Sequence, residues 1–554
     1  MRRGVFRPIV AVTGLAVAAA MVSVPAFSVE KPNRAGAGLL AHLSQSVQFR
    51  YYLAHPDEAP EGFAPRLGAV HPVSSRVSDA RPVAPTGARF NLDTTGLSQN
   101  EESVTVCENR PSFVLSATND YRGLLDPEGN FTGWAISTDR GRSVAKEGLM
   151  PSVNVGGVQT PSGGDPVVAA DEHCTLYGAS LAYSATDPSG PTPNGIVMYR
   201  STPETLGAAT CGDATSGFHQ PSMSDPDCWS SAVAAQTVGG PAGHFLDKEW
   251  LAVGDTGDGE HVWVTYSDFT NADTTIGFSR AQVFAVRCDE NLADCTAPIL
   301  ISETDNDVAF SYVTVGPDGR TYVTWAGVQG ELEGRPQTFS PRMRIAPAGS
   351  TTFGPIRTVD TLENAIGFDT VLHADDFRVA TGPKNAVQMV DGHARELLVY
   401  EECNYRIQGL ICEEPRVTLA WSDDDGATWA HKRISVRGDN YFPTLAVDPD
   451  TGKPVAAWFT NRYDPFHHRQ DIEMAVLDRR SLKVVVRKRV TRVSNEPNAD
   501  YLLGGVFIGD YIQVAAVGGR AFIAYNANFV PMPFLGGGAP EYQQDNYLSV
   551  RKLT

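Results

Sequence analysis

The stretch Trp421-Ser-Asp-Asp-Asp-Gly-Ala-Thr-Trp429 carries the pattern Ser-x-Asp-x-Gly-x-Thr-Trp. Residues 416–421 before it are rich in β-branched and aromatic side chains, which favour a strand, and residues 431–436 after it can form a second one. The segment between them is therefore predicted to be a hairpin turn. In this turn the carboxylate of Asp424 accepts hydrogen bonds from turn amides, and Gly426 supplies the positive φ that a tight turn requires.

A second, weaker copy of the pattern lies at Ser137–Val144, with Ser in place of Thr and Val in place of Trp, and eroded copies lie near Ser201 and Thr352. These hairpins resemble the Asp-box, or BNR repeat, of the sialidase-like β-propeller superfamily. The resemblance covers the chain from about Phe90 to its C-terminus. It implies an all-β fold, a β-propeller of six or seven four-stranded blades with Asp-box hairpins. It also implies that the boxes lie on the rim, away from the face that carries chemistry.

A repeating unit supports this fold. From Phe90 onward a segment rich in Val and Ala, a segment that ends in an aromatic residue and a third segment that leads to a turn recur at intervals of roughly 50 to 75 residues. About seven such units can be traced. A six-bladed ring with one long insertion stays open at this point. A β-sandwich followed by a second all-β domain is the structural alternative, and the repeated hairpins argue against it.

The length, the charge and the N-terminus set outer limits on function. The chain has 554 residues and a formal net charge of -19, which argues against nucleic acid or an anionic membrane as its main partner. Arg2 and Arg3 precede the apolar run Ile9–Val24, so residues 1–28 are predicted to be a signal peptide; an N-terminal membrane anchor is the alternative. Residues 29–88 are predicted to be a linker or arm, and residues 89–554 the propeller. We expect a secreted or extracytoplasmic monomer.

The eight cysteines fit an exported protein. Spacing alone does not fix their connectivity, so the pairing is a hypothesis. The hypothesis has three local pairs and one longer link between neighbouring units: Cys211–Cys228, Cys288–Cys295, Cys403–Cys412 and Cys107–Cys174. We predict no cofactor and no metal site, because the chain has no CxxC pair, no HExxH motif and no Gly-rich phosphate loop.

Most candidate site residues precede the inner strands, because loops that enter those strands surround the mouth of a propeller channel. Asp120 and Arg122 lie between the strands of the first unit, and Arg462 follows a second strand. The candidates combine acids, cations and tyrosines, as glycoside cleavage requires. The predicted catalytic residues are Asp247, Asp376, Asp510 and Tyr511. The predicted substrate-binding residues are Asp120, Arg122, Asp165, Lys248, Arg378, Tyr441 and Arg462. For each single residue, turn capping or an ion pair between blades is the alternative.

The resemblance implies a glycan as substrate or partner. True sialidases share an early Arg-Ile-Pro motif, an acid Asp, a clamp of three arginines and a late Tyr-Glu pair. This chain has no Arg-Ile-Pro, and only Arg122, Arg378 and Arg462 are placed to form a clamp from three units. We predict a secreted, sialidase-like glycoside hydrolase that acts on extracellular carbohydrate at the channel mouth. The alternatives are a non-catalytic propeller that binds a glycan or a protein, and a polysaccharide lyase.

Overall fold

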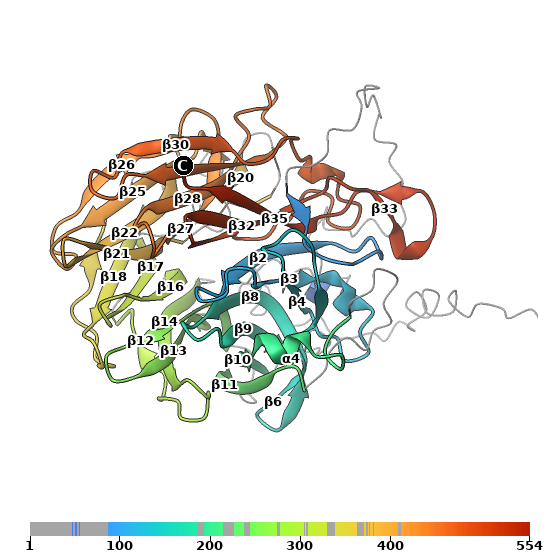
Figure 1. Cartoon of the computed structure of the whole chain (residues 1–554), viewed down its shortest axis with the longest axis horizontal. Helices are drawn as coiled ribbons and strands as arrows, with labels where there is room; N and C mark the ends of the chain where they lie inside the picture. Colours follow the sequence, from blue (N-terminus) through green and yellow to red (C-terminus); the bar gives the residue numbers. More distant parts are fainter. Residues whose placement is uncertain are drawn as a thin grey trace, which may run out of the picture.

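The computed structural model is almost entirely β-structure. The residues that it describes are 47, 50–52, 55, 87–184, 193–213, 227–237, 244–273, 278–303, 305, 308–329, 338–362, 371–372, 375, 377–379, 382–407 and 411–554. Within these ranges seven four-stranded antiparallel sheets are arranged around a centre (Figure 1). The predicted propeller is therefore confirmed, and the open choice of blade number is resolved at seven.

Six blades take their four strands in sequence order, from the channel to the rim. The strands of the first three blades are β2 (Gln99–Val106), β3 (Val114–Asp120), β4 (Thr132–Ser137), β5 (Lys146–Leu149); β8 (Ser162–Ala170), β9 (Leu176–Tyr183), β10 (Asn194–Ser201), β11 (Ser230–Thr237); and β12 (His244–Asp255), β13 (Glu260–Asp273), β14 (Phe278–Asp289), β15 (Ile299–Leu300). Those of the next three are β16 (Val308–Val315), β17 (Thr321–Gln329), β18 (Thr338–Ala346), β19 (Arg357–Thr358); β21 (Lys384–Val390), β22 (His393–Glu402), β25 (Arg416–Ser422), β26 (Ala430–Arg433); and β27 (Asn440–Val447), β28 (Pro454–Thr460), β29 (Asp471–Leu477), β30 (Val484–Arg489).

The seventh blade closes the ring with strands from both ends of the propeller. Its members are β31 (Gln513–Val517), β32 (Arg520–Ala527), β35 (Asp545–Lys552) and β1 (Ala88–Arg89). β1 pairs with β35, with Ala88 opposite Leu548 and Arg89 opposite Tyr547. In Figure 1 the blue β2 accordingly lies beside the red β32 and β35. Closure covers the sheet faces that the first and last blades of an open array would expose, and each blade keeps only a short outer edge strand.

Short elements decorate the loops between these strands. They are η2 (Tyr121–Leu124), β6 (Val153–Val155), β7 (Val158–Thr160), α4 (Pro203–Gly207), β20 (Val371–Leu372), β23 (Tyr405–Ile407), β24 (Ile411–Glu413), η3 (Pro497–Ala499), β33 (Met532–Pro533), η4 (Phe534–Gly536) and β34 (Pro540–Glu541). No helix among the described residues is both long and apolar enough to span a membrane.

Aromatic residues of the second strands fill the space between blades. Trp263 in β13, Trp325 in β17 and Trp458 in β28 have no exposed surface. Burying one such side chain contributes about 2–3 kcal/mol. The aromatic residues that the repeating unit places at the second strand are thus the main packing residues of the ring.

The hairpin between β25 and β26 has the turn chemistry that its sequence predicts. Asp424 accepts hydrogen bonds from the backbone N–H and the hydroxyl of Thr428 and from the hydroxyl of Ser422. These hydrogen bonds lower the pKa of Asp424, and the bond from the Thr428 hydroxyl has the largest effect. Gly426 has φ 71°, and Trp429 donates from Nε1 to its carbonyl. The carboxylate is therefore occupied by its own turn and is not available for catalysis.

All four predicted disulfides are present: Cys107–Cys174, Cys211–Cys228, Cys288–Cys295 and Cys403–Cys412. Cys107 follows β2 and Cys174 lies in the turn between β8 and β9, so this bond ties the first blade to the second. It also joins the most distant residues in sequence of the four, 67 apart.

The longest of these loops gives a prediction on stability. In the chain-entropy account a closed loop of that length contributes about 4 kcal/mol and the seven-residue loop of Cys288–Cys295 about 2 kcal/mol. The double variant Cys107→Ser/Cys174→Ser is therefore expected to lose about 2 kcal/mol more unfolding free energy than Cys288→Ser/Cys295→Ser. Denaturant titration followed by tryptophan fluorescence measures both. Equal losses would contradict the assignment of Cys107–Cys174 as the main covalent tie.

Candidate functional site

Five inner strands share a two-residue bulge near the end at which they enter the ring. Their pairing with the second strand skips residues 101–102, 165–166, 248–249, 310–311 and 442–443. The first residue of each bulge has a positive φ, which is costly for a side chain other than glycine. These residues and their φ angles are Glu101 (59°), Asp165 (53°), Lys248 (59°), Phe310 (54°) and Phe442 (50°). The strain recurs in five of seven blades, and it brings charged side chains of different blades together at the centre.

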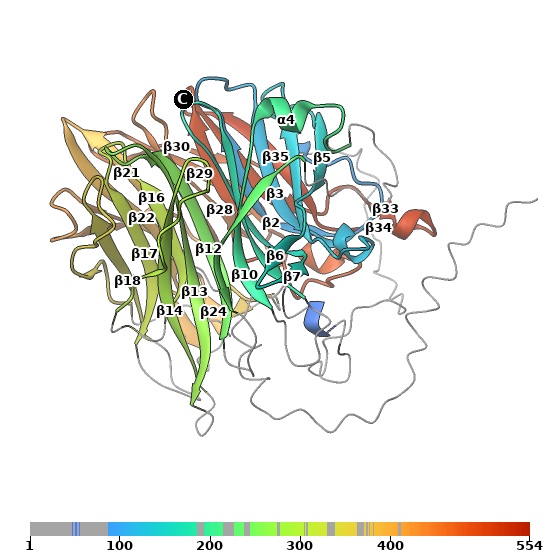
Figure 2. The same cartoon turned by 90° about the horizontal axis from the view of Figure 1, so that it is seen from below.

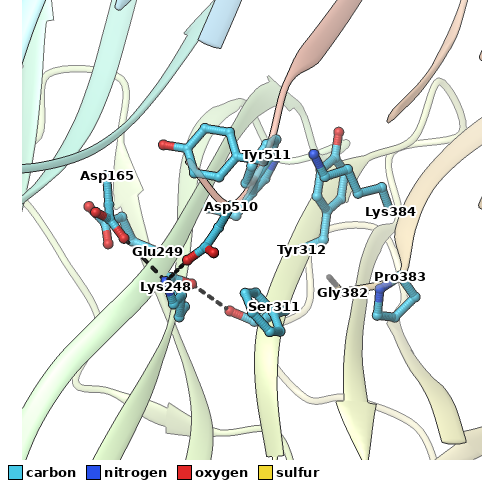
Figure 3. A pocket seen from close by; sticks show the side chains of 12 residues that line it. Asp165, Lys248, Glu249, Ser311, Tyr312, Gly382, Pro383, Lys384, Asp510 and Tyr511 are labelled. Atoms are coloured by element: carbon cyan, nitrogen blue, oxygen red, sulfur yellow. Dashed lines mark hydrogen bonds and ion pairs between the residues drawn. The ribbon is translucent and has the colours of Figure 1, made fainter. Parts of the chain in front are cut away.

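An ion cluster joins four of the blades. The carboxylate of Asp510, just before β31, accepts hydrogen bonds from Nε and Nη2 of Arg378 and from Nζ of Lys248, the last at 2.6 Å. The same Nζ lies 3.5 Å from Oδ2 of Asp165 (Figure 3). Burial alone would raise the pKa of Asp510, but Arg378 and Lys248 lower it to about 2. Asp510 is therefore an ionised carboxylate held between two cations.

A protonated carboxyl lies directly against this cluster. Oε1 of Glu101 accepts a hydrogen bond from the backbone N–H of Asp510 at 3.0 Å, and Oε2 accepts one from Nδ2 of Asn119 at 2.7 Å. Burial raises the pKa of Glu101 well above its usual value, and the negative charges of Asp165 and Asp510 add to this. A side-chain hydrogen bond joins Glu101 to Asp165 and acts in the same direction. This raised pKa favours the protonated form of Glu101.

A small cavity lies beside the ion cluster. It has a volume of about 30 Å³, enough for one or two water molecules. Residues of the bulges in β8, β12 and β16 line it, together with the residues before β21 and β31: Asp165, Lys248, Glu249, Trp250, Phe310, Ser311, Tyr312, Gly382, Pro383, Lys384, Asp510 and Tyr511. Figure 3 shows the acids and Lys248 on one side of it and Tyr312 and Lys384 on the other. The cavity therefore has a charged wall and an aromatic wall.

The aromatic wall holds a buried lysine. The rings of Trp250 and Tyr312 stack at 4.3 Å, and Tyr511 meets Trp250 edge to face at 5.5 Å. Nζ of Lys384 lies 5.0 Å from the Trp250 ring and donates to the carbonyl of Ile512. Burial among these groups lowers the pKa of Lys384 to about 7, although the charge of Glu401 opposes the shift. A large part of the Lys384 population is thus a neutral amine at physiological pH.

Lys384 gives a second prediction on stability. Its pKa is about 7 in the folded chain against the usual 10.5, so unfolding takes up a proton between these pH values and stability rises with pH across that window. Lys384→Met removes the free-energy cost of keeping this buried amine. We expect the variant to exceed the wild type by about 1–3 kcal/mol at pH 7, with the advantage shrinking toward pH 10. Unfolding titrations at pH 7 and pH 9.5 measure it. A destabilised variant with no change across pH would contradict a desolvated Lys384.

The structure brings some of the predicted site residues together. Asp165, Lys248, Arg378 and Asp510 form the ion cluster described above. Asp247 is fully buried beside it and accepts a hydrogen bond from the backbone N–H of Lys248. The hydroxyl of Tyr511 donates to the carbonyl of Pro166 across the ring at 2.7 Å. Burial raises the pKa of Tyr511 well above its usual value, so it is a neutral phenol that bridges two blades.

Other predicted residues make contacts elsewhere. Arg122 pairs with Asp120 and with Glu147, all within the first blade. Arg462 pairs with Glu473 at 3.4 Å in the sixth blade. Because Arg122 and Arg462 have these partners, they do not join Arg378 in the ion cluster, and no three-arginine clamp is assembled there.

Two further predictions have separate outcomes. Tyr441 is fully buried, stacks on Phe459 and donates from its hydroxyl to Gln470, so its contacts are those of a packing residue. Asp376 lies outside the described residues, and its predicted catalytic role stays a prediction.

Sequence reasoning missed Glu101 and Lys384. The pair 101–102 has the same place in β2 that Asp165-Pro166 and Lys248-Glu249 have in the inner strands of the next two blades. Aligning the units on the residue after each bulge would have revealed Glu101. Lys384 has no such local signal, because its burial depends on aromatic residues from two other blades.

Comparisons with known proteins give matches of fold only. No protein-family model and no curated protein sequence matches the chain. Among solved structures, the Hadza microbial sialidase Hz136 aligns with a TM-score of 0.42 and 12% identity over 76% of this chain and 73% of its own. An alpha-L-arabinanase from Penicillium chrysogenum, complexed with arabinobiose, aligns with a TM-score of 0.40 and 12% identity over 72% and 99%. A sialidase from Trypanosoma rangeli, in complex with the inhibitor DANA, aligns with a TM-score of 0.33 and 9% identity over 66% and 53%.

The described residues contain no group of three or more His, Cys, Asp or Glu side chains arranged to hold a metal ion. What they do contain is a buried ring of acids and cations from different blades, in which the pKa of Glu101 is raised and that of Asp510 is lowered. The chain is a seven-bladed β-propeller with this ring of buried charges at its centre.

Proposed function

We propose that this protein is an exported glycan-active enzyme, a glycoside hydrolase that works at the mouth of the propeller channel. The observation that carries the proposal is the protonated Glu101 beside the ionised Asp510. Hydrolysis of a glycosidic bond needs one carboxyl that gives a proton to the leaving oxygen and a second that is negatively charged. Two carboxyl groups with pKa values pushed apart by their surroundings supply these roles.

Each side chain then has a defined task. Glu101 is the general acid, and Asp165 orients its carboxyl group through a side-chain hydrogen bond. Asp510 is the ionised carboxylate, which faces the developing positive charge of the sugar and is kept ionised by Lys248 and Arg378. Glu101 and Asp510 are direct neighbours, because Oε1 of Glu101 accepts a hydrogen bond from the backbone N–H of Asp510 at 3.0 Å.

The charge balance of the site favours a neutral glycan. Lys248 and Arg378 both pair with Asp510, and the cluster contains at least as many carboxylates as cations. An acidic sugar would need a cation that is not already neutralised. The chain's net charge of -19 also repels anionic substrates. Sialosides and uronic acid polymers are therefore the less favoured substrates.

A screen against three substrate classes tests this proposal. Purified protein is incubated with neutral aryl glycosides, with sialosides and with uronic acid polysaccharides, and released sugar is measured. We expect release from a neutral glycoside and little from the other two. If none of the three substrate classes is cleaved and a glycan binds without being cleaved, the protein is a non-catalytic glycan-binding propeller and the hydrolase proposal is wrong.

The buried amine of Lys384 supports a second candidate function, that of a polysaccharide lyase. Its pKa of about 7 makes it a possible base for the proton next to a uronate carboxyl group. Such an enzyme would yield an unsaturated product from the uronic acid polymer, which ultraviolet absorbance detects. Loss of this product in Lys384→Met, together with retained activity in Glu101→Gln, would establish the lyase in place of the hydrolase.

A further inference from the structure

A segment far from the propeller in sequence is packed on the mouth of the ring. Its described residues, Val47, Arg50, Tyr51, Tyr52 and His55, are called the arm segment here. Val47 and Tyr51 are 0% and 6% exposed and belong to the same apolar cluster as residues of the second and third blades. Figure 2 shows the arm segment as a short blue helix on the lower side of the ring, the side toward which β13 and β14 project furthest. The arm segment is therefore docked on the propeller.

Arg50 anchors the arm segment in a pocket formed by the first two blades. Its Nη1 donates to the carbonyl of Gly163 at 3.3 Å and its Nη2 to the carbonyl of Gly129 at 3.1 Å. The guanidinium carbon lies 4.6 Å from the centre of the Phe131 ring and 4.8 Å from that of Tyr183. Arg50 is 8% exposed. Two carbonyl oxygens and two aromatic faces form a site that is specific for a flat cation.

The pocket adjoins the carboxyl site. Gly163 is two residues before Asp165 in β8, so the carbonyl that holds Arg50 lies on the strand that carries the bulge. Burial raises the pKa of Tyr183, and the charges of Arg50, Asp165 and Asp247 all act on the same hydroxyl. The arm segment therefore lies within electrostatic reach of the ion cluster.

The carboxyl site itself is closed. Glu101, Asp165 and Asp510 are 0%, 2% and 3% exposed, although they lie where the inner strands enter the channel. The cavity beside them holds only water-sized molecules. A glycan therefore needs a cover to move before it reaches these carboxyl groups.

We propose that the arm segment is this cover: it docks on the mouth of the first three blades through the Arg50 pocket and holds most of the protein in a closed form, which lowers its activity. The arm segment belongs to the same chain as the propeller, so closure is intramolecular and depends on the contacts of Arg50. Displacement of the arm, or its removal by proteolysis, opens the site. The inhibitory part of this inference rests on the hydrolase proposed above, whereas the docking part does not.

A cleavable chain tests docking without any substrate. A recognition sequence for a specific protease is inserted between Val77 and Ser78 of the full-length protein, which is then cut and passed over a gel-filtration column. We expect the N-terminal fragment to stay with the propeller. In Arg50→Ala we expect at least a tenfold drop in the retained fraction, and in Arg50→Lys an intermediate one, because lysine has no flat fork for two carbonyls. Arg480→Ala is the matched control, since Arg480 is exposed and pairs with Asp391 on the other side of the ring.

The outcomes separate docking from inhibition. Release of the fragment from the wild type, or equal retention in Arg50→Ala and Arg480→Ala, would overturn the docking. If docking holds, Arg50→Ala and the cut protein are expected to turn over a neutral glycoside at least five times faster than the intact wild type. Unchanged turnover would overturn the inhibitory role. Absence of turnover in every variant, with the retention difference intact, would refute the hydrolase and restrict the arm to docking.

Discussion

Replacing Glu101 by Gln is expected to lower the turnover of a glycoside by about 10²–10⁴-fold, the usual contribution of a general acid. Gln keeps the shape of the side chain and can still accept from the backbone N–H of Asp510, but it has no proton to give. We expect the variant to lose about 1–3 kcal/mol of unfolding free energy, because the NH2 group of Gln then faces Nδ2 of Asn119 and cannot accept its hydrogen bond. Steady-state kinetics and thermal unfolding of the same preparations measure both.

The control for this variant is Glu396→Gln. Glu396 is also fully buried and has a pKa raised to about 7, chiefly by burial, but it lies in β22 beside Arg320 and Ser422, away from the channel site. Its replacement is expected to leave turnover unchanged. Equal activity of the two Gln variants would remove Glu101 from the mechanism. In the wild type, kcat/KM should fall as pH rises through the raised pKa of Glu101, because the acid loses its proton there.

Replacing Asp510 by Asn is expected to destabilise the fold by about 3–5 kcal/mol, because it leaves the buried Lys248 and Arg378 without their shared counter-charge. Asp510 has a lowered pKa in the folded chain, about 2 against the usual 3.8. Its contribution is therefore fully present above about pH 4 and is lost as pH falls toward 2. Wild type and variant should differ most at neutral pH and converge in acid.

Denaturant titrations at pH 7 and pH 3 measure this effect. Asp424→Asn is the comparison, because Asp424 is exposed and serves only its own turn, and its replacement is expected to lower the unfolding free energy far less than that of Asp510. If Asp510→Asn unfolded with the free energy of the wild type, the ion cluster would not be a structural centre of the ring.

The sequence predicted those features that depend on neighbouring residues. The turn at Asp424 was predicted because its hydrogen bonds join residues within four positions of one another. Three of the four disulfides close short loops, so proximity in sequence was enough to pair them. Asp165, Lys248 and Asp510 were identified because each precedes an inner strand.

The features that were missed depend on long-range pairing. Glu101 reaches the site because β2 bulges against β3, and this shift of register cannot be seen in β2 alone. Arg122 was expected at the mouth, but Glu147 on the fourth strand of the same blade binds it, and only the folded blade brings the two together. The Arg50 pocket joins residues 79 and 113 positions away from the arginine, which local patterns do not reveal.

The protonation of Glu101 is the most direct test of the proposed mechanism, and it needs no substrate. Infrared spectra of the wild type and of Glu101→Gln are recorded at pH 7, and their difference isolates the carbonyl stretch of a protonated carboxyl at this residue. We predict that the wild type shows this band and that the variant lacks it. A difference spectrum with only the bands of an ionised carboxylate would show that Glu101 is charged and would contradict its role as the acid.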